Sequence, residues 1–578
     1  MKSTKGTRLL TRWAKELDKA CPLIDYPRPQ LKRDSYICLN GEWDFVFFKG
    51  DGLPTEYRKK IVVPFAPESA LSGVEFTPCS CESMVYRRFF DLDESFLKKR
   101  VLLHFGAVDQ LCEVYLNGTL IKKNEGGYVP FTIECTAYLK ESQNELIVKA
   151  KDALDLIYPY GKQTKNRGGM WYTPVSGIWQ TVWLESVPEN YIEGLKITQT
   201  KSKATIEVFG ALGKKTLTLI DSGESFCFTE NKIEITPSEI KLWTPESPYL
   251  YRFTLETEND RVESYFALRE IGVSDFNGVK RLTLNGAPYL FHGLLDQGYF
   301  PDGLFTPASY DAYRYDILYA KAAGFNTLRK HIKIEPDIFY YLCDELGMVV
   351  FQDMVNNSDY SFFRDTVLPT VGVKRVPDKR LHKNAVSREI FLKTAEKTIE
   401  LLYNHPSVLY YTIFNEGWGQ FDADYVYETL KPLDESRIFD STSGWFWQSE
   451  SDVDSHHVYF KKVRVKPHRK MPTVISEFGG YSYRVKNHLF GDKNYGYKTF
   501  KTQEELTKSV ENLYLDEICP LVKSCISALV YTQISDIEDE TNGFLTYDRE
   551  VSKVDIARLK NIKIALDAAL SDGVKKEL

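Results

Sequence analysis

The chain has 578 residues and a formal net charge of −6 at pH 7, with 74 basic and 80 acidic residues. This length is more than one hydrophobic core supports, so we expect roughly two to four domains. The balanced charges exclude the basic footprint of a nucleic-acid-binding protein, and no apolar run approaches the roughly 20 residues of a membrane helix.

Residues 1–188 are predicted to form an all-β domain. Short runs such as 41–48 and 101–105 are rich in β-branched and aromatic residues and are bounded by turn residues, which is typical of strands. Asn117-Gly118 lies between two further runs of this kind and indicates a type I′ hairpin. A jelly-roll-like sandwich fits this pattern best.

Residues 189–273 keep the β character on a smaller scale. Residues 204–208 alternate between apolar and polar side chains, and similar runs follow at 216–220 and 249–255. Short alternating strands in a segment of this size predict an immunoglobulin-like sandwich. The Cys…Trp…Cys spacing of true immunoglobulin domains is absent, so this prediction concerns architecture only.

From residue 274 to 578, strand and helix patterns alternate. Helical patterns at 309–323, 336–346, 387–404 and 502–524 separate eight candidate strands, at 289–293, 326–329, 348–351, 408–414, 437–440, 455–459, 473–476 and 528–532. Eight strands with helical connections indicate a (β/α)8 TIM barrel. A doubly wound sheet is the alternative, but no Gly-rich phosphate turn follows its first strand.

Two glutamates follow strands of this predicted barrel. The continuous apolar run 408–414 is typical of a strand buried on both faces, and Asn415 and Glu416 come directly after it. Glu477 follows the short strand 473–476. Because parallel barrel strands end at one mouth, the two carboxyl groups are expected to face each other. Glycosidic bond cleavage requires such a pair, although a lone Asn-Glu pair also occurs in ordinary solvated loops.

Other segments match one known family. Residues 39–45 and 175–185 lie in the first predicted sandwich, 243–251 in the second, and 324–329 with 405–407 in the barrel. Together with the two glutamates they resemble glycoside hydrolase family 2, which includes β-galactosidases, β-glucuronidases and β-mannosidases. The resemblance covers almost the whole chain and implies the same order of jelly roll, immunoglobulin-like sandwich and TIM barrel.

The resemblance also implies roles for individual residues. Glu416 would be the general acid/base, Glu477 the nucleophile of a retaining double displacement, and Asn415 a hydrogen-bond partner of the sugar's 2-hydroxyl. An enclosed site beside Trp418, a further candidate for substrate binding, would favour the neutral form of Glu416. Arg329, at the end of the second strand, is a candidate to keep Glu477 ionised; an ordinary ion pair at the rim is the alternative.

Four more candidates for substrate binding come from the barrel. The family often has a tyrosine near its nucleophile, and Tyr459 fits this role. His456 and His457 point to opposite faces of one strand, so we expect one of them, His457 in our assignment, to face the substrate. Trp445 is a candidate stacking wall, with core packing as the alternative. Asp296, after the first strand, is a candidate partner of sugar hydroxyls.

Departures from the family pattern direct the substrate prediction. Residues 538–548, after the last strand, are acidic and lack the lysine of the Asn-X-Lys pair with which family β-glucuronidases bind the sugar carboxylate. An acidic mouth would repel a uronate, so we expect an exo-acting retaining hydrolase of a neutral, galactoside-like β-glycoside, with galactofuranosides and α-L-arabinopyranosides included. β-Glucuronidase is the second choice. A non-hydrolytic carbohydrate-binding protein and a transglycosylase are further alternatives.

The cysteines bear on location and on metals. Cys79-Ser-Cys81 is the only close pair among ten, and no second pair completes the spacing of a zinc site. The basic N-terminal residues 1–13 contain no apolar segment of signal-peptide length. We therefore expect a cytoplasmic protein without a metal or a cofactor. A carbohydrate is its expected partner, nucleic acid and membrane are not, and a homo-oligomer is left open.

Overall fold

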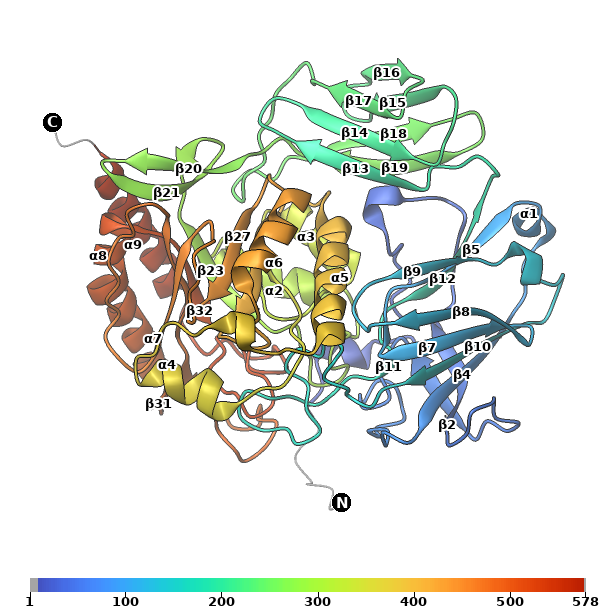
Figure 1. Cartoon of the computed structure of the whole chain (residues 1–578), viewed down its shortest axis with the longest axis horizontal. Helices are drawn as coiled ribbons and strands as arrows, with labels where there is room; N and C mark the ends of the chain where they lie inside the picture. The colour runs from blue at the N-terminus through green and yellow to red at the C-terminus, as the bar shows by residue number, and fades with distance from the viewer. Residues whose placement is uncertain (1–8, 576–578) are drawn as a thin grey trace.

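Two antiparallel sheets packed face to face form the N-terminal part of the computed structural model, which describes residues 9–575 (Figure 1). Their orders are β3-β2-β4-β10-β7-β8 and β1-β12-β5-β9. The strands are β1 (Tyr36–Cys38), β2 (Gly41–Phe48), β3 (Lys59–Val63), β4 (Ser83–Phe90), β5 (Arg100–Phe105), β7 (Leu111–Leu116), β8 (Thr119–Glu125), β9 (Phe131–Glu134), β10 (Asn144–Lys151) and β12 (Val182–Val187). Their inner faces share one hydrophobic core, which agrees with the predicted sandwich.

The turn between β7 and β8 confirms the predicted hairpin. Asn117 and Gly118 both have positive φ angles, 51° and 83°, as a type I′ turn requires. The predicted domain limits at 188 and 273 stay predictions. The first eight residues of the chain and its last three lie outside the described residues, and so does most of the basic N-terminal stretch.

A second, smaller sandwich lies above the other two parts in Figure 1. Its sheets have the orders β13-β14-β17 and β16-β15-β18-β19. The strands are β13 (Gly194–Gln199), β14 (Ala204–Phe209), β15 (Lys215–Leu219), β16 (Ser225–Phe228), β17 (Lys232–Ile235), β18 (Tyr251–Glu256) and β19 (Arg261–Phe266). A three-stranded sheet, β20 (Ile271–Phe276), β21 (Val279–Leu284) and β22 (Ala287–Pro288), leads into the third part.

The third part is a parallel eight-stranded sheet of order β27-β26-β25-β24-β23-β32-β29-β28. Its strands are β23 (Phe291–Asp296), β24 (Thr327–Lys330), β25 (Val349–Asp353), β26 (Val408–Asn415), β27 (Ile438–Ser443), β28 (Asp454–Val458), β29 (Thr473–Gly479) and β32 (Ile526–Thr532). The edge strands meet, because Ser455 on β28 donates a 2.9 Å hydrogen bond to Asp440 on β27. The near-closed barrel confirms the predicted TIM fold and excludes the doubly wound alternative.

Helices surround the barrel strands: α2 (Asp311–Ala322), α3 (Asp337–Leu346), α5 (Ala385–Leu402), α6 (Ala423–Leu430), α7 (Gln503–Asn512), α8 (Cys519–Ser524) and α9 (Ile556–Val574). The helical pattern predicted at 502–524 is confirmed, since residues 503–524 are helical throughout, with a π-helical segment at Leu513–Ile518 between α7 and α8. Pro520, in the first turn of α8, lacks an N–H group, so the α-helical hydrogen-bond ladder cannot continue through it.

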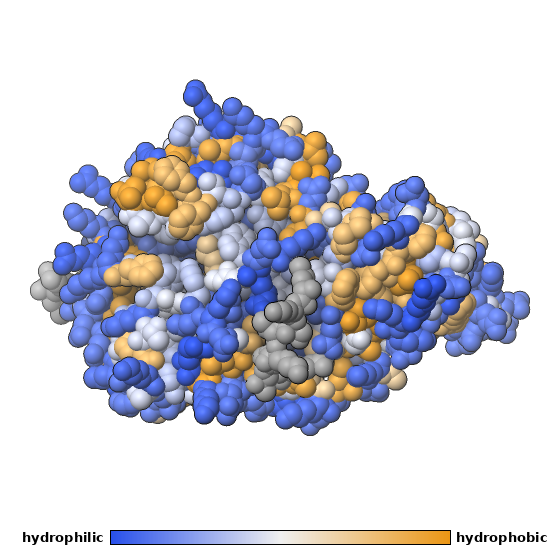
Figure 2. Space-filling model, turned by 90° about the horizontal axis from the view of Figure 1, so that it is seen from below, coloured by the Kyte–Doolittle hydropathy of each residue, from blue (hydrophilic) through white to orange (hydrophobic). Residues whose placement is uncertain are grey.

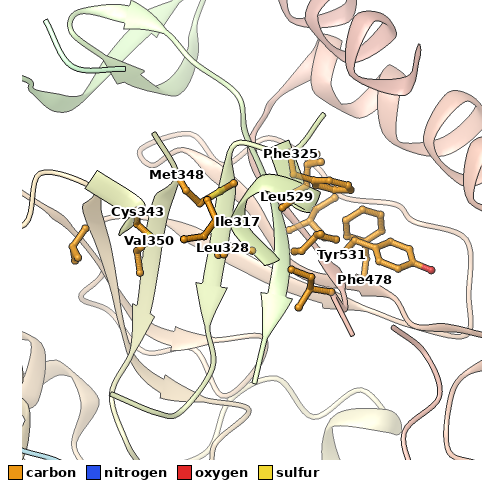
Figure 3. Packing of buried hydrophobic residues seen from close by; sticks show 14 of the residues in the cluster. Ile317, Phe325, Leu328, Cys343, Met348, Val350, Phe478, Leu529 and Tyr531 are labelled. Atoms are coloured by element: carbon orange, nitrogen blue, oxygen red, sulfur yellow. The ribbon is translucent and has the colours of Figure 1, made fainter. Parts of the chain in front are cut away.

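The barrel core explains why its strands are so apolar. Leu328 of β24 and Leu529 of β32 belong to one hydrophobic cluster with Ile317 of α2, and Val350 of β25 lies near Cys343 of α3 (Figure 3). Every residue of β26 is buried, because side chains on one face fill the barrel and those on the other contact the helices. The ends of such strands are the first positions where polar side chains meet solvent.

On the face seen in Figure 2, hydrophobic side chains gather in separate patches between charged residues, and the surface is hollowed to one side of its centre. Among the helices in residues 9–575, none is both long enough and apolar enough to cross a membrane. All ten cysteines are free thiols.

A buried histidine fastens the second sandwich to the barrel. His405 precedes β26, and its ring nitrogens lie 2.6 Å from Asp344 Oδ2 and 2.8 Å from Asp337 Oδ1, both on α3. Tyr265 of β19 donates a 2.7 Å hydrogen bond to the same Asp344. Burial alone would lower the pKa of His405, but the two carboxylates outweigh it and raise the pKa to about 9.

The free energy of unfolding should therefore decrease as pH rises through a defined window. A raised histidine pKa contributes stability that is complete below the unfolded value of about 6.5 and is lost as pH rises through about 9. We expect His405→Gln to remove on the order of 3 kcal/mol of this pH dependence, measured as denaturation midpoints from pH 6 to 10. His456→Gln, at a partly exposed histidine, is the control; an unchanged slope in His405→Gln would contradict the assignment.

Candidate active site

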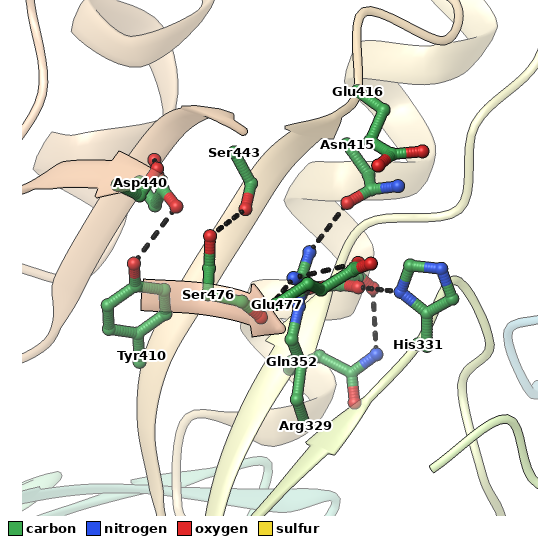
Figure 4. Close-up of polar contacts among 12 residues, drawn as sticks. Arg329, His331, Gln352, Tyr410, Asn415, Glu416, Asp440, Ser443, Ser476 and Glu477 are labelled. Carbon is green, nitrogen blue, oxygen red and sulfur yellow. Dashed lines mark hydrogen bonds and ion pairs between the residues drawn. The ribbon is translucent and has the colours of Figure 1, made fainter. Parts of the chain in front are cut away.

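The ends of three barrel strands bring four predicted site residues together. Arg329 of β24, Asn415 and Glu416 at the end of β26, and Glu477 of β29 surround one position at the barrel mouth (Figure 4). One carboxylate oxygen of Glu416, one of Glu477 and a ring nitrogen of His457 all lie within 4.8 Å of one another. The expectation that the two glutamates face each other agrees with this geometry.

Glu477 is held as a carboxylate. Arg329 Nη1 lies 3.2 Å from its Oε1, and the hydroxyl of Tyr459 donates a 2.6 Å hydrogen bond to its Oε2. His457 Nδ1 lies 3.7 Å from the same Oε2. Burial alone would raise the pKa of Glu477, but the neighbouring positive groups, His457 and Arg329 first among them, hold it well below its usual range. Tyr459 directly follows β28 and so lies where the sequence places it.

Arg329 is the centre of a buried polar network and not a rim residue, since it is only 1% exposed. Its Nε lies 2.9 Å from Asp353 Oδ1, and its Nη2 donates a 2.8 Å hydrogen bond to Asn415 Oδ1. His331 Nδ1 lies 2.6 Å from the other oxygen of Asp353. The guanidinium group thereby fixes Asn415 and Glu477 relative to each other. Asn415 Nδ2 has no partner among the described residues.

Glu416 occupies a constrained backbone. Its φ angle is 53°, in the left-handed region that non-glycine residues seldom adopt outside sites where the surroundings enforce it. Its N–H donates to Ser443 O at 2.9 Å, and its carbonyl accepts from Trp445 Nε1 at 2.9 Å. Glu416 Oε1 lies 2.8 Å from His457 Nδ1. These contacts turn the carboxyl group toward Glu477.

Irregular strand pairing aims two of these side chains. The register of β28 against β29 shifts between His456 and His457, and that of β29 against β32 shifts between Ile475 and Phe478. Such bulges reorient side chains and are common beside functional sites. His457 faces the carboxylates, whereas His456 Nε2 lies 2.9 Å from Asp454 on the outer side.

The remaining predicted residues lie in different places. Trp445 is part of the site wall, with its ring 5.4 Å from that of His457. Trp418 is 2% exposed and stacks on Trp171 at 5.4 Å, so its ring faces are largely covered. Asp296 lies apart: its oxygens accept from Lys330 Nζ at 2.6 Å and from the N–H of residue 298 at 2.8 Å. Because both of its oxygens already accept hydrogen bonds, Asp296 is less suited than Asn415 to bind the hydroxyl groups of a sugar.

A loop of the N-terminal sandwich completes the site. The sequence did not predict this contribution. Tyr160 N–H donates to Asn356 O at 3.0 Å, and Tyr172 OH donates to the carboxylate of Glu540. Residues 154–175 therefore lie on the loops that follow β25 and β32. No local pattern in 154–175 signals this position, because it depends on how two domains pack.

The acidic stretch after β32 does not form the open acidic mouth that we expected. Glu538 and Glu540 are buried; Glu538 accepts a 3.0 Å hydrogen bond from Thr173 N–H, and Glu540 accepts from Tyr172. Burial raises the pKa of both carboxyl groups. Their charges are turned to the sandwich loop, so the sequence-based reason for excluding an anionic substrate is weakened.

The three atoms of Glu416, His457 and Glu477 that lie within 4.8 Å of one another are also of metal-ligand type. Both oxygens of Glu477 already have protein partners, Arg329 and Tyr459. This saturation favours a carboxylate that acts without a metal. The absence of a metal remains a prediction.

Removing the central cation should destabilise the barrel. We expect Arg329→Met to lower the free energy of unfolding by about 3–5 kcal/mol at pH 7, because Asp353 and Glu477 lose their buried counter-charge. Both carboxyl groups have depressed pKa values, so the difference should shrink as pH falls toward those values and both become protonated. Chemical denaturation at pH 7 and at about pH 3, below the unfolded pKa values of about 4, measures this.

Arg252→Met provides the matched control, since Arg252 forms an exposed ion pair with Glu345 at 3.0 Å. Exposed pairs contribute about 0–1 kcal/mol. If the two variants lost the same stability, the buried network would not have the role we assign to it.

Three family models match most of the chain between residues 67 and 482. A model described as glycosyl hydrolase 2 galactose-binding domain-like matches residues 67–175, one described as glycosyl hydrolases family 2 matches 189–269, and one described as glycosyl hydrolases family 2, TIM barrel domain, matches 278–482. A β-galactosidase of Thermoanaerobacter pseudethanolicus is 24% identical over 465 residues, or 71% of this chain and 58% of that protein. A β-galactosidase large subunit of Leuconostoc lactis is 23% identical over 402 residues, or 64% and 60%.

The chain thus spans about three fifths of the length of these two relatives. Among solved structures, a β-glucuronidase of an uncultured Clostridium species has a TM-score of 0.71 at 16% identity, covering 93% of this chain and 99% of that one. A GH2 β-galacturonidase from Eisenbergiella tayi bound to glycerol has a TM-score of 0.66 at 18% identity, covering 94% and 98%. These likenesses show the same three-part fold.

Proposed function

The chain belongs to glycoside hydrolase family 2, and from that premise we propose that it is an exo-acting glycosidase that retains the configuration of the sugar. One observation carries the proposal: oxygens of Glu416 and Glu477 lie within 4.8 Å of each other at the ends of two barrel strands. Retaining glycosidases hold their carboxyl groups about 5–5.5 Å apart, whereas inverting enzymes leave about 6.5–9.5 Å for a water molecule. The short separation supports a double displacement.

In the first half-reaction, the Glu477 carboxylate attacks the anomeric carbon while the bond to the leaving oxygen breaks. Glu416 donates its proton to that oxygen. The depressed pKa of Glu477 supports the nucleophilic role, because the group is ionised before it attacks. The hydroxyl of Tyr459, 2.6 Å from Oε2, keeps the carboxylate oriented.

In the second half-reaction, Glu416 accepts a proton from water, and the resulting nucleophile breaks the bond between the sugar and Glu477. His457 Nδ1, 2.8 Å from Glu416 Oε1, holds the acid/base in position for both steps. Asn415 is suited to bind the 2-hydroxyl, because Arg329 fixes its Oδ1 and leaves Nδ2 without a partner among the described residues. A sugar hydroxyl in place of the water would give transglycosylation.

For the sugar, our first candidate is a neutral, galactoside-like unit, including β-galactofuranosides and α-L-arabinopyranosides. The absence of lysine from residues 538–548 supports it. The second candidate is a β-glucuronide. One observation favours it: Glu538 and Glu540 are bound by Thr173 and Tyr172 and do not project into the mouth.

We also propose a reducing, cytoplasmic location. Ten free thiols, two of them exposed in Cys79-Ser-Cys81, support it, because such pairs oxidise in secretory compartments. A carbohydrate is the proposed partner of the barrel mouth.

Substitution of the two glutamates tests the reaction. We expect Glu416→Ala to lower kcat/KM on nitrophenyl glycosides by about 100- to 10,000-fold, and Glu477→Gln to remove measurable turnover. The substrate panel is β-galactopyranoside, β-galactofuranoside, α-L-arabinopyranoside, β-glucuronide and β-mannoside. Added azide should restore turnover of Glu416→Ala and give a β-glycosyl azide, because a small anion reaches the covalent intermediate from the face that Glu416 leaves open.

Glu450→Gln, at an exposed glutamate of the same barrel, is the control and should behave as wild type. Near-normal turnover by Glu477→Gln would sink the catalytic assignment. An inactive wild type across the panel, with sugar binding retained, would favour the non-hydrolytic carbohydrate-binding alternative.

A further inference from the structure

Lys162 reaches the barrel mouth from the N-terminal sandwich. Its backbone is fixed, because its carbonyl accepts a 3.0 Å hydrogen bond from Tyr172 N–H, and the N–H of Gly161 donates to Asn356 O at 3.4 Å. Gly161 has a φ of +64°, and a Cβ there would lie 2.8 Å from Ile332 O. The loop therefore approaches the barrel so closely at this point that only glycine fits, and Lys162 comes next.

The ammonium group of Lys162 lies over two aromatic rings of the site. Its Nζ is 5.5 Å from the ring centre of Trp418 and 5.8 Å from that of Tyr172. Trp418 follows Glu416 by two residues, and its own Nε1 is buried without an acceptor among the described residues. Both the ammonium group of Lys162 and the indole N–H of Trp418 thus lack an acceptor among the described residues.

This lack of a partner separates Lys162 from the other lysines at the same end of the barrel. Lys330 lies 2.6 Å from Asp296, Lys333 lies 2.9 Å from Glu335, and Lys553 lies 2.5 Å from Asp536. Across residues 9–575, Lys162 forms no ion pair with a carboxylate. The two aromatic rings offset part of the hydration that this half-buried cation loses, and the negative charge of a ligand would offset more.

The positive charge also lies within electrostatic reach of the catalytic pair. It contributes to lowering the pKa of Glu477, after His457, Arg329 and His331, and it opposes the rise in the pKa of Glu540 that burial causes. Charge compensation for these carboxylates is therefore the rival role for Lys162. This role predicts that substitution of Lys162 lowers kcat/KM equally for acidic and neutral substrates.

We propose that Lys162 is a specificity-determining residue that binds a carboxylate of the substrate beside the catalytic pair. The inference rests on the proposed glycosidase function. A primary ammonium on a flexible stem binds such a group as a point charge. The carboxylate has two sources: C6 of the cleaved sugar, which makes the substrate a hexuronide, or the leaving group attached to a neutral sugar.

The test compares Lys162→Met and Lys162→Arg with wild type on matched pairs of substrates. For the sugar, the pair is nitrophenyl β-glucuronide or β-galacturonide against the corresponding β-glucoside or β-galactoside. For the leaving group, it is 4-carboxyphenyl against phenyl β-galactoside. In one of the two arms, we expect Lys162→Met to lower kcat/KM for the acidic member by about 10- to 100-fold more than for its neutral partner, and Lys162→Arg to recover part of the loss.

Lys165→Met is the matched control, because Lys165 is exposed on the same loop and its Nζ donates to Ala153 O at 3.1 Å. It should leave both members of each pair unchanged. Equal losses on acidic and neutral substrates in Lys162→Met, with a shifted pH profile, would overturn the proposal in favour of charge compensation. No loss in either arm would also overturn it.

A binding measurement keeps the proposal testable if turnover is absent. Glucuronate, galacturonate, 4-carboxyphenyl β-galactoside and their neutral counterparts are titrated into wild type and Lys162→Met, with calorimetry and melting temperature as readouts. We expect tighter binding of one acid in wild type and no preference in Lys162→Met. Acid-selective binding without hydrolysis would refute the proposed reaction and support the role of Lys162; hydrolysis without acid selectivity would do the reverse.

Discussion

The ion pair between Arg329 and Glu477 is the interaction on which the site depends. Two carboxyl groups whose oxygens lie within 4.8 Å repel each other strongly when both are charged. A fully buried guanidinium group resolves this by favouring one of them, since Arg329 pairs with Glu477 at 3.2 Å and forms no ion pair with Glu416 in the part of the chain that the structure describes. The two glutamates thereby acquire different properties from different surroundings, as acid/base chemistry with two like groups requires.

That ion pair in turn needs the rest of the barrel. Asp353 binds Arg329 through Nε and is itself bound by His331, so the guanidinium group has one orientation. These residues lie at or beside the C-terminal ends of parallel strands, and β24, β25, β26 and β29 converge because the sheet curls into a near-closed barrel. The bulges at His457 and Glu477 add a local change of direction that regular pairing would not give.

The sequence predicts this arrangement only in part, for physical reasons. Glu416 and Glu477 are recognisable because apolar strands end abruptly in polar residues, and strand period and burial are local properties. Asp353 and His331 also lie where apolar strands end. Single polar residues at strand ends are common, so the sequence does not distinguish these two from others. The contacts of Glu538 and Glu540 were not accessible from the sequence, because Tyr172 and Thr173 lie more than 360 residues away in the chain. The sequence shows that residues 538–548 are acidic, but the packing of the two domains determines where their carboxylates point.

The N-terminal sandwich also shapes the site. A barrel alone would leave its mouth open beside Trp418, and here the wall is supplied by Trp171, Tyr172 and Lys162 from another domain. The geometry of the site then depends on how firmly the domains dock, which is a property of buried contacts such as Tyr160 with Ser358 at 2.8 Å. The proposed catalytic groups sit on barrel strands, and the proposed substrate-facing lysine sits on a docked loop. In such a site, specificity can change through the sandwich while the carboxylate pair in the barrel stays the same.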